Sequence, residues 1–163
     1  MKISFRKPPD LSRICLTSSG SPDGHTFKNI LILSRDNIKV FIREYKAFDG
    51  IFVFNKETKE LALSLWDEDL RHRKMARFQF GEANSAKMIG ALLTFVKTNK
   101  EVSFELYGES CYFGKPLEQD LQMAVDYLQE LLKSIGLPST IEKKPDCIII
   151  RSELPVKTDS SIS

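Results

Sequence analysis

Hydrophobic and polar residues alternate through much of the segment from residue 26 to residue 80, and this alternation predicts β-strands. The side chains of a strand point to its two faces in turn, so residues two positions apart share a face. The polar runs between the alternating stretches are typical of turns. The predicted strands cover residues 27–33, 38–47, 51–55, 60–66 and 73–80, with a hairpin turn at Asp49-Gly50. We therefore expect an antiparallel meander in this part of the chain.

The spacing of apolar residues changes to a helical period after residue 80. Apolar residues there predict a helix over residues 82–97 that packs on one face of the sheet; they are Met88, Ile89, Leu92, Leu93 and Val96. A strand at 102–107, a long helix at 117–135 and a strand at 147–150 are predicted next. The expected fold class is α+β: an antiparallel meander sheet with a packing helix, then a strand–long helix–strand segment.

The length of 163 residues allows one domain, or a small domain with an appended unit. We expect an irregular arm at 1–25, the sheet with its helix at 26–100, the strand–helix–strand segment at 101–153 and a disordered tail at 154–163. The chain lacks a run of the roughly 20 apolar residues that a membrane helix needs. Because no secretory signal is evident either, we expect an intracellular protein, cytoplasmic or in the nucleoid or nucleus.

One face of the predicted sheet is aromatic and basic, whereas the other is aliphatic. Exposed rings on which bases stack, with cations for phosphates among them, are what a platform for single-stranded nucleic acid needs. Arg73 and Lys74 belong to a basic cluster at a strand edge and suit phosphate contacts. The predicted nucleic-acid-binding residues are Lys39, Phe41, Arg43, Tyr45, Phe52, Phe54, Trp66, Arg73, Lys74 and Arg77. The expected partner is therefore single-stranded DNA or RNA.

The same pattern has a second interpretation. A sheet that is covered on both sides also has two apolar faces, and its aromatic residues then belong to the core. The cover would be helix 117–135 or a partner chain, and the protein would be a protein-interaction module. The net charge of +2 does not decide the matter, because a local basic patch matters more than the total. The presence of Lys39, Arg43 and Arg77 on the aromatic face favours an open platform, since buried cations are rare unless paired.

The long helix carries a seam of apolar residues at alternating spacings of four and three. The seam consists of Leu117, Leu121, Ala124, Leu128, Leu131 and Ile135. Nearly three heptads of this pattern indicate a dimerisation helix, which makes a homodimer the expected state. An amphipathic helix that packs on its own domain shows almost the same stripe, so both interpretations remain open.

The sequence contains little that indicates catalysis. His25 and His72 are isolated, and the three cysteines have no metal or redox spacing. Asp67-Glu68-Asp69 could hold a divalent cation in a nuclease, but consecutive carboxylates are more typical of a solvated turn. We therefore expect a non-enzyme without cofactor or bound metal, with a metal-dependent nuclease as the less favoured alternative.

The order strand, strand, strand, strand, helix over residues 38–96 resembles the single-stranded-DNA-binding fold of the Whirly proteins and the general positive transcription cofactor. The resemblance is carried by Ile38 to Tyr45, the strand at 60–66, and Phe78 to Ala83 at the start of the helix. The appended seam is also similar to that of ThermoDBP-type archaeal single-strand binders. Both resemblances imply a dimer, and the first implies that unpaired strands bind on the sheet.

Overall fold

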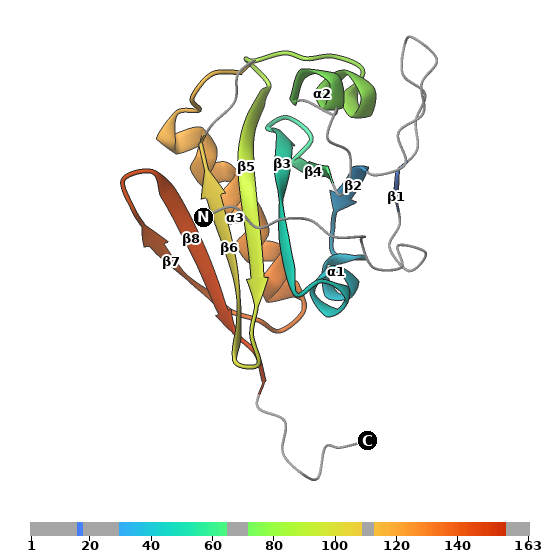
Figure 1. Cartoon of the computed structure of the whole chain (residues 1–163). Helices are drawn as coiled ribbons and strands as arrows, with labels where there is room; N and C mark the ends of the chain where they lie inside the picture. The colour runs from blue at the N-terminus through green and yellow to red at the C-terminus, as the bar shows by residue number, and fades with distance from the viewer. Residues whose placement is uncertain (1–15, 18–29, 65–71, 109–112, 156–163) are drawn as a thin grey trace.

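The computed structural model of the chain is an α+β fold built on one antiparallel sheet of eight strands with three helices (Figure 1). It describes residues 16–17, 30–64, 72–108 and 113–155. The strands are β1 (Leu16–Thr17), β2 (Ile30–Leu33), β3 (Ala47–Asn55), β4 (Glu60–Ser64), β5 (Met88–Lys97), β6 (Glu101–Tyr107), β7 (Ser139–Lys143) and β8 (Cys147–Glu153), and the helices are α1 (Ile38–Glu44), α2 (His72–Phe80) and α3 (Glu118–Ser134). Their order across the sheet is β1-β2-β4-β3-β5-β6-β8-β7. The predicted α+β class is confirmed.

The predicted strand 38–47 is wrong, because residues 38–44 form helix α1. The aliphatic alternation in this segment coincides with a helical spacing. Ile38, Phe41, Ile42 and Tyr45 lie at positions i, i+3, i+4 and i+7, and all four are buried. Asn37 fixes the turn that starts the helix: its Oδ1 accepts from the Ser34 amide at 2.8 Å, and its Nδ2 donates to the Ile32 carbonyl at 2.7 Å. Side-chain hydrogen bonds of this kind stabilise turns before helices.

The predicted hairpin at Asp49-Gly50 is also wrong, since both residues lie inside the continuous strand β3. Gly50 has a packing role there. A Cβ atom at Gly50 would lie 2.9 Å from the carbonyl oxygen of Ser64 and 3.0 Å from Cζ of Phe48. The glycine therefore permits the close approach of a neighbouring backbone and a ring, which is a recognised use of glycine inside a strand.

For two further segments the predicted strand and the predicted helix are both wrong. Residues 72–80 form helix α2 instead of a strand, with Met75 and Ala76 buried and Arg73 and Arg77 exposed one turn apart. The predicted helix 82–97 contains strand β5 instead. The first six residues of β5 are apolar or glycine, and most are buried because both faces of the strand are packed there, one by each core cluster. A short apolar run does not distinguish a buried strand from a helix by its spacing.

The remaining described elements follow the prediction more closely. Strands β4, β6 and β8 and helix α3 agree with the predicted elements at 60–66, 102–107, 147–150 and 117–135 to within a few residues. Strand β2 covers the second part of the predicted strand 27–33. Strand β7 was not predicted, because its sequence is polar and it lies at the sheet edge, where only one neighbour is needed.

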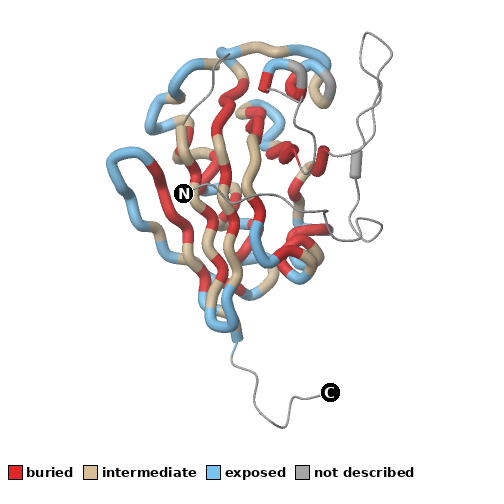
Figure 2. Tube along the Cα trace, in the orientation of Figure 1, coloured by how far each residue is buried: buried red, intermediate tan, exposed pale blue. Residues whose placement is uncertain are grey.

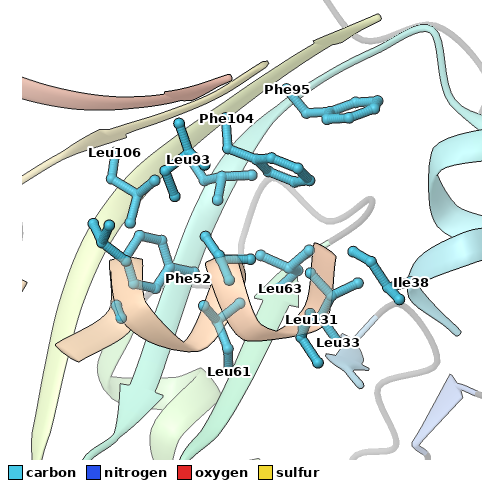
Figure 3. Packing of buried hydrophobic residues seen from close by; sticks show 14 of the residues in the cluster. Leu33, Ile38, Phe52, Leu61, Leu63, Leu93, Phe95, Phe104, Leu106 and Leu131 are labelled. Atoms are coloured by element: carbon cyan, nitrogen blue, oxygen red, sulfur yellow. The ribbon is translucent and has the colours of Figure 1, made fainter. Parts of the chain in front are cut away.

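The core has two layers, one on each face of the sheet. Helices α1 and α3 pack on the first face, where Phe52, Leu93, Phe104 and Leu131 belong to one large buried cluster (Figure 3). Helix α2 packs on the second face with a smaller cluster around Val53. Figure 1 views the sheet from this second side, with α3 behind the strands. Buried and half-buried positions alternate along β6, so only one of its two faces is covered by a described helix (Figure 2).

Candidate nucleic-acid interface

The predicted stacking residues lie in the core. Phe41, Phe52 and Phe54 have no exposed surface and Tyr45 is 4% exposed. The Phe41 ring centroid lies 4.9 Å from that of Tyr45 and 5.2 Å from that of Phe95, as in a packed aromatic cluster. The expectation that these four rings form an open platform is therefore wrong. Trp66 and the acidic run Asp67-Glu68-Asp69 lie outside the described residues.

Helix α3 provides the cover over Phe52 and Phe54. The Tyr127 ring of this helix lies 5.7 Å from that of Phe54, and its hydroxyl donates to the Leu33 carbonyl at 2.7 Å. Nζ of Lys56 lies 3.1 Å from Oδ2 of Asp120 and ties the turn between β3 and β4 to the start of α3. The chain thus covers its aromatic face with its own helix, as the alternative interpretation of the sequence proposed.

The predicted phosphate-binding residues separate into two surfaces. Lys39 and Arg43 are exposed on α1, whereas Arg73 and Arg77 are exposed on α2. The two helices pack on opposite faces of the sheet, and Figure 1 shows them at opposite ends of it. The side chain of Lys74, on α2, lies outside the described residues. The prediction that Lys39, Arg43 and Arg77 share one sheet face is therefore wrong.

Helix α1 carries the more continuous of the two surfaces. Lys39 and Arg43 lie one turn apart on one side of α1, and Arg35 lies four residues before Lys39, in the turn that precedes the helix. Lys46 is exposed just beyond the end of the helix. We call Arg35, Lys39, Arg43 and Lys46 the α1 basic surface. The sequence contained the signal for it, since the spacing of four indicates a helix side, but interpreting this segment as a strand concealed Arg35 and Lys46.

The charges around α1 are partly engaged in holding the helix. Nζ of Lys97 donates to the carbonyl oxygens of Ile42 at 2.7 Å and Arg43 at 3.1 Å, at the negative end of the helix dipole. Nε of Arg43 lies 3.8 Å from Oε1 of Glu44, while the Arg43 side chain keeps 57% of its surface exposed. Asp36 is the exposed carboxylate beside the surface. The arrangement leaves a locally positive surface that an anionic partner can reach.

Helix α2 has cations where its dipole disfavours them. Arg73 lies in the first turn, which carries no acidic residue, and the positive end of the helix dipole is there. His72 starts the same turn, but burial lowers the pKa of its imidazole, and the ring hydrogen-bonds to a backbone carbonyl. His72 is thus part of the packing of α2 and is not placed to contact a ligand.

The described residues contain no group of three or more histidine, cysteine, aspartate or glutamate side chains that could hold a metal ion. Cys147 is buried, and this burial raises the pKa of its thiol. Cys15 and Cys111 lie outside the described residues. No helix in the described ranges is both long enough and apolar enough to cross a membrane.

The seam of α3 packs on the sheet of its own chain. Four of its six residues, Leu121, Ala124, Leu128 and Leu131, are at most 8% exposed within the main core cluster. Ile135 packs against that cluster, and Leu117 is 61% exposed. The prediction that the seam is a dimer interface is wrong for the buried residues. The homodimer itself remains a prediction.

The segment on which the resemblance to the Whirly proteins was based was predicted as four strands followed by a helix. The structure has a different order of elements there. Residues 38–97 fold as helix, strand, strand, helix and strand. The resemblance itself stays a prediction. Comparison with protein-family models, with curated proteins and with solved structures found no match.

Proposed function

We propose that this protein binds single-stranded nucleic acid without catalysis, through phosphate contacts on the α1 basic surface. The observation that carries the proposal is the row of exposed cations Arg35, Lys39, Arg43 and Lys46 along one helix and its ends. Lysine and arginine that neutralise phosphates supply a sequence-independent part of nucleic-acid affinity. The carboxylates at Asp36 and Glu44 reduce this charge but leave the row net positive.

The structure changes the mode of binding that the sequence suggested. Because Phe41, Tyr45, Phe52 and Phe54 are buried, bases cannot stack on them without unfolding the core. The binding we propose therefore depends on phosphate contacts. We expect weak, salt-sensitive binding with little dependence on base sequence.

Titration of a fluorescently labelled oligo-dT by the protein, followed by anisotropy at several salt concentrations, tests the proposal. The logarithm of the affinity should fall linearly with the logarithm of the salt concentration. Lys39→Ala and Arg43→Ala should each weaken binding and make that slope shallower by about one. Lys59→Ala and Lys133→Ala are matched controls, because both lysines are exposed but lie outside the α1 basic surface. The controls should bind like the parent.

Three results would separate the alternatives. Equal affinity of the parent and the α1 variants would remove the α1 basic surface from the proposal. Loss of binding in Arg73→Ala and Arg77→Ala alone would transfer the contact to α2. Cleavage of the oligonucleotide with Mg²⁺, abolished by Asp67→Asn, would replace the proposal by the nuclease alternative.

A further inference from the structure

The sheet has a half-open face that no described helix covers. This face belongs to β5, β6, β8 and β7, with the start of β3 beside β5, and lies opposite α3 (Figure 1). Along β6 the residues Val102, Phe104 and Leu106 are buried beneath α3 and α1, whereas the alternate residues of the strand are half-exposed on the other side. Strand register places the half-exposed residues of β6 beside Arg151 and Glu153 of β8.

The net charge of the side chains on this half-open face is negative. Its strand positions carry five carboxylates and one cation: Asp49, Glu101, Glu105, Glu142 and Glu153, with Arg151. We call the five carboxylates and the strand positions between them the acidic sheet face. Arg151 forms an ion pair with Glu142, so it is already engaged. Glu101 lies directly opposite Glu153 in the strand register, and like charges in that arrangement destabilise a sheet.

Apolar side chains lie between these carboxylates. Leu92 and Val96 of β5 are half-buried and keep part of their apolar surface in water, whereas Ile149 of β8, which lies between Glu105 and Glu142 in the register, is buried. A surface with an apolar centre and an acidic border fits a short segment that has apolar side chains and several cations. Such a segment would offset the repulsion between the carboxylates and remove apolar surface from water.

We propose that residues 1–15 of this chain dock on the acidic sheet face. Their charge is complementary, since the segment carries Lys2, Arg6, Lys7 and Arg13 against one carboxylate, Asp10. Ile3 and Phe5 alternate with Lys2, Ser4 and Arg6, so an extended segment has one apolar side. That side packs on Leu92 and Val96, while the long cationic side chains reach the carboxylates at the border.

The connection to the rest of the chain is long enough for this docking. Residues 1–15 lead into β1, which is five strand intervals from β6 in the order of the sheet. Five intervals span about 24 Å at the usual strand separation. Fifteen extended residues reach at most about 50 Å. The docked segment is distinct from the α1 basic surface, so the inference does not depend on the proposed nucleic-acid binding.

Paramagnetic relaxation in the full chain tests the proposal. A nitroxide label is attached at Ser4→Cys in a chain whose three cysteines are replaced by serine, and methyl signals are compared before and after reduction of the label. We expect loss of signal at Leu92, Val96 and Ile149, and full signal at Val125 and Leu132 of α3. Full signal at the first three residues, or equal loss at all five, would overturn the docking.

Charge reversal gives a second measurement that needs no label and keeps the native cysteines. Lys2→Glu with Arg6→Glu should shift the methyl signals of Leu92, Val96 and Ile149, and high salt should shift them in the parent in the same direction. Lys59→Glu with Lys133→Glu makes the same change in net charge on exposed residues elsewhere and should leave those signals in place. Equal shifts in both double variants would overturn the proposal.

Mixing nitroxide-labelled copies with isotope-enriched copies shows whether the docked segment comes from the same chain or from a second copy. If the segment docks on its own chain, an isotope-enriched copy without nitroxide keeps its signals when a nitroxide-labelled copy is added. Loss of the Leu92 and Ile149 signals in the enriched copy would instead assign the acidic sheet face to the N-terminal segment of a second copy, and the intramolecular proposal would be wrong.

Discussion

Nε2 of His72 lies 2.9 Å from the carbonyl oxygen of Ala91, in the contact between α2 and β5. Because a carbonyl oxygen only accepts hydrogen bonds, the imidazole donates from Nε2. Gly90 makes room for this contact, since a Cβ atom there would lie 2.7 Å from Cδ2 of His72 and 2.8 Å from Cδ2 of Phe113. The second face of the sheet is therefore joined to α2 by a buried histidine whose pKa is lowered by its burial.

Acidification should destabilise the fold through His72. Burial lowers the pKa of this imidazole below 6.5 in the folded chain. Between 6.5 and the folded value, the unfolded chain binds a proton that the native chain does not. The free energy of unfolding should therefore fall as the pH is lowered through 6.5. His72→Gln should show a weaker dependence, as measured by urea unfolding at several pH values.

Truncation of the buried aromatic residues should reduce stability. Phe52→Ala removes a fully buried ring beneath α3 and should lower the free energy of unfolding by about 3–5 kcal/mol. Urea denaturation measures this. Lys39→Ala, on the exposed side of α1, should change it by no more than about 0.5 kcal/mol. If Phe52→Ala were as stable as Lys39→Ala, the ring would not be in the core.

Two tyrosines should respond in opposite ways to removal of their hydroxyl groups. Tyr127 donates to the Leu33 carbonyl, so Tyr127→Phe should cost about 1 kcal/mol or more, because it leaves a carbonyl oxygen without that donor. The Tyr45 hydroxyl is buried without a hydrogen-bond partner among the described residues, and burial raises its pKa to about 12. Tyr45→Phe should therefore leave stability unchanged or raise it. Thermal unfolding of the two variants makes the comparison, and equal losses would contradict it.

The same leucine-to-glutamate change should have different effects along α3. Leu128→Glu places a charge in the core against the sheet and should unfold the chain. Leu117 is 61% exposed, so Leu117→Glu should be tolerated. Circular dichroism and size-exclusion chromatography distinguish the outcomes. A folded monomer from Leu128→Glu, derived from a dimeric parent, would restore the seam as a dimer interface.

The sequence predicted an element correctly where the spacing of its apolar residues fitted either a strand or a helix, but not both. Residues 102–107 alternate strictly, and the stripe of 117–135 is too long for a strand, so both were predicted correctly. Residues 38–45 satisfy two periods at once, because Ile38, Val40 and Ile42 alternate while Ile38, Phe41 and Tyr45 follow a helical spacing. Only the packing of α1 on the sheet decides between them, and a single segment does not contain that information.

The candidate site was harder to predict for a related reason. A ring such as Phe54 looks the same in the sequence whether its face of the sheet is open or covered. Its burial depends on where α3 docks, and α3 begins 64 residues later along the chain than Phe54. Lys39 and Arg43, which we propose as phosphate contacts, were correctly expected to be exposed, since long cationic side chains are rarely buried unless paired.

The contact between Tyr127 and Leu33 joins residues that lie 94 positions apart, and this separation has a consequence for biosynthesis. When a ribosome has completed β6, the rings of Phe52 and Phe54 already belong to the growing sheet, but α3, which covers them, has yet to be made. At roughly 5–20 residues per second, the thirty or so residues through α3 take a few seconds to appear. During that interval the nascent chain offers an apolar surface to chaperones, and the surface closes when α3 arrives.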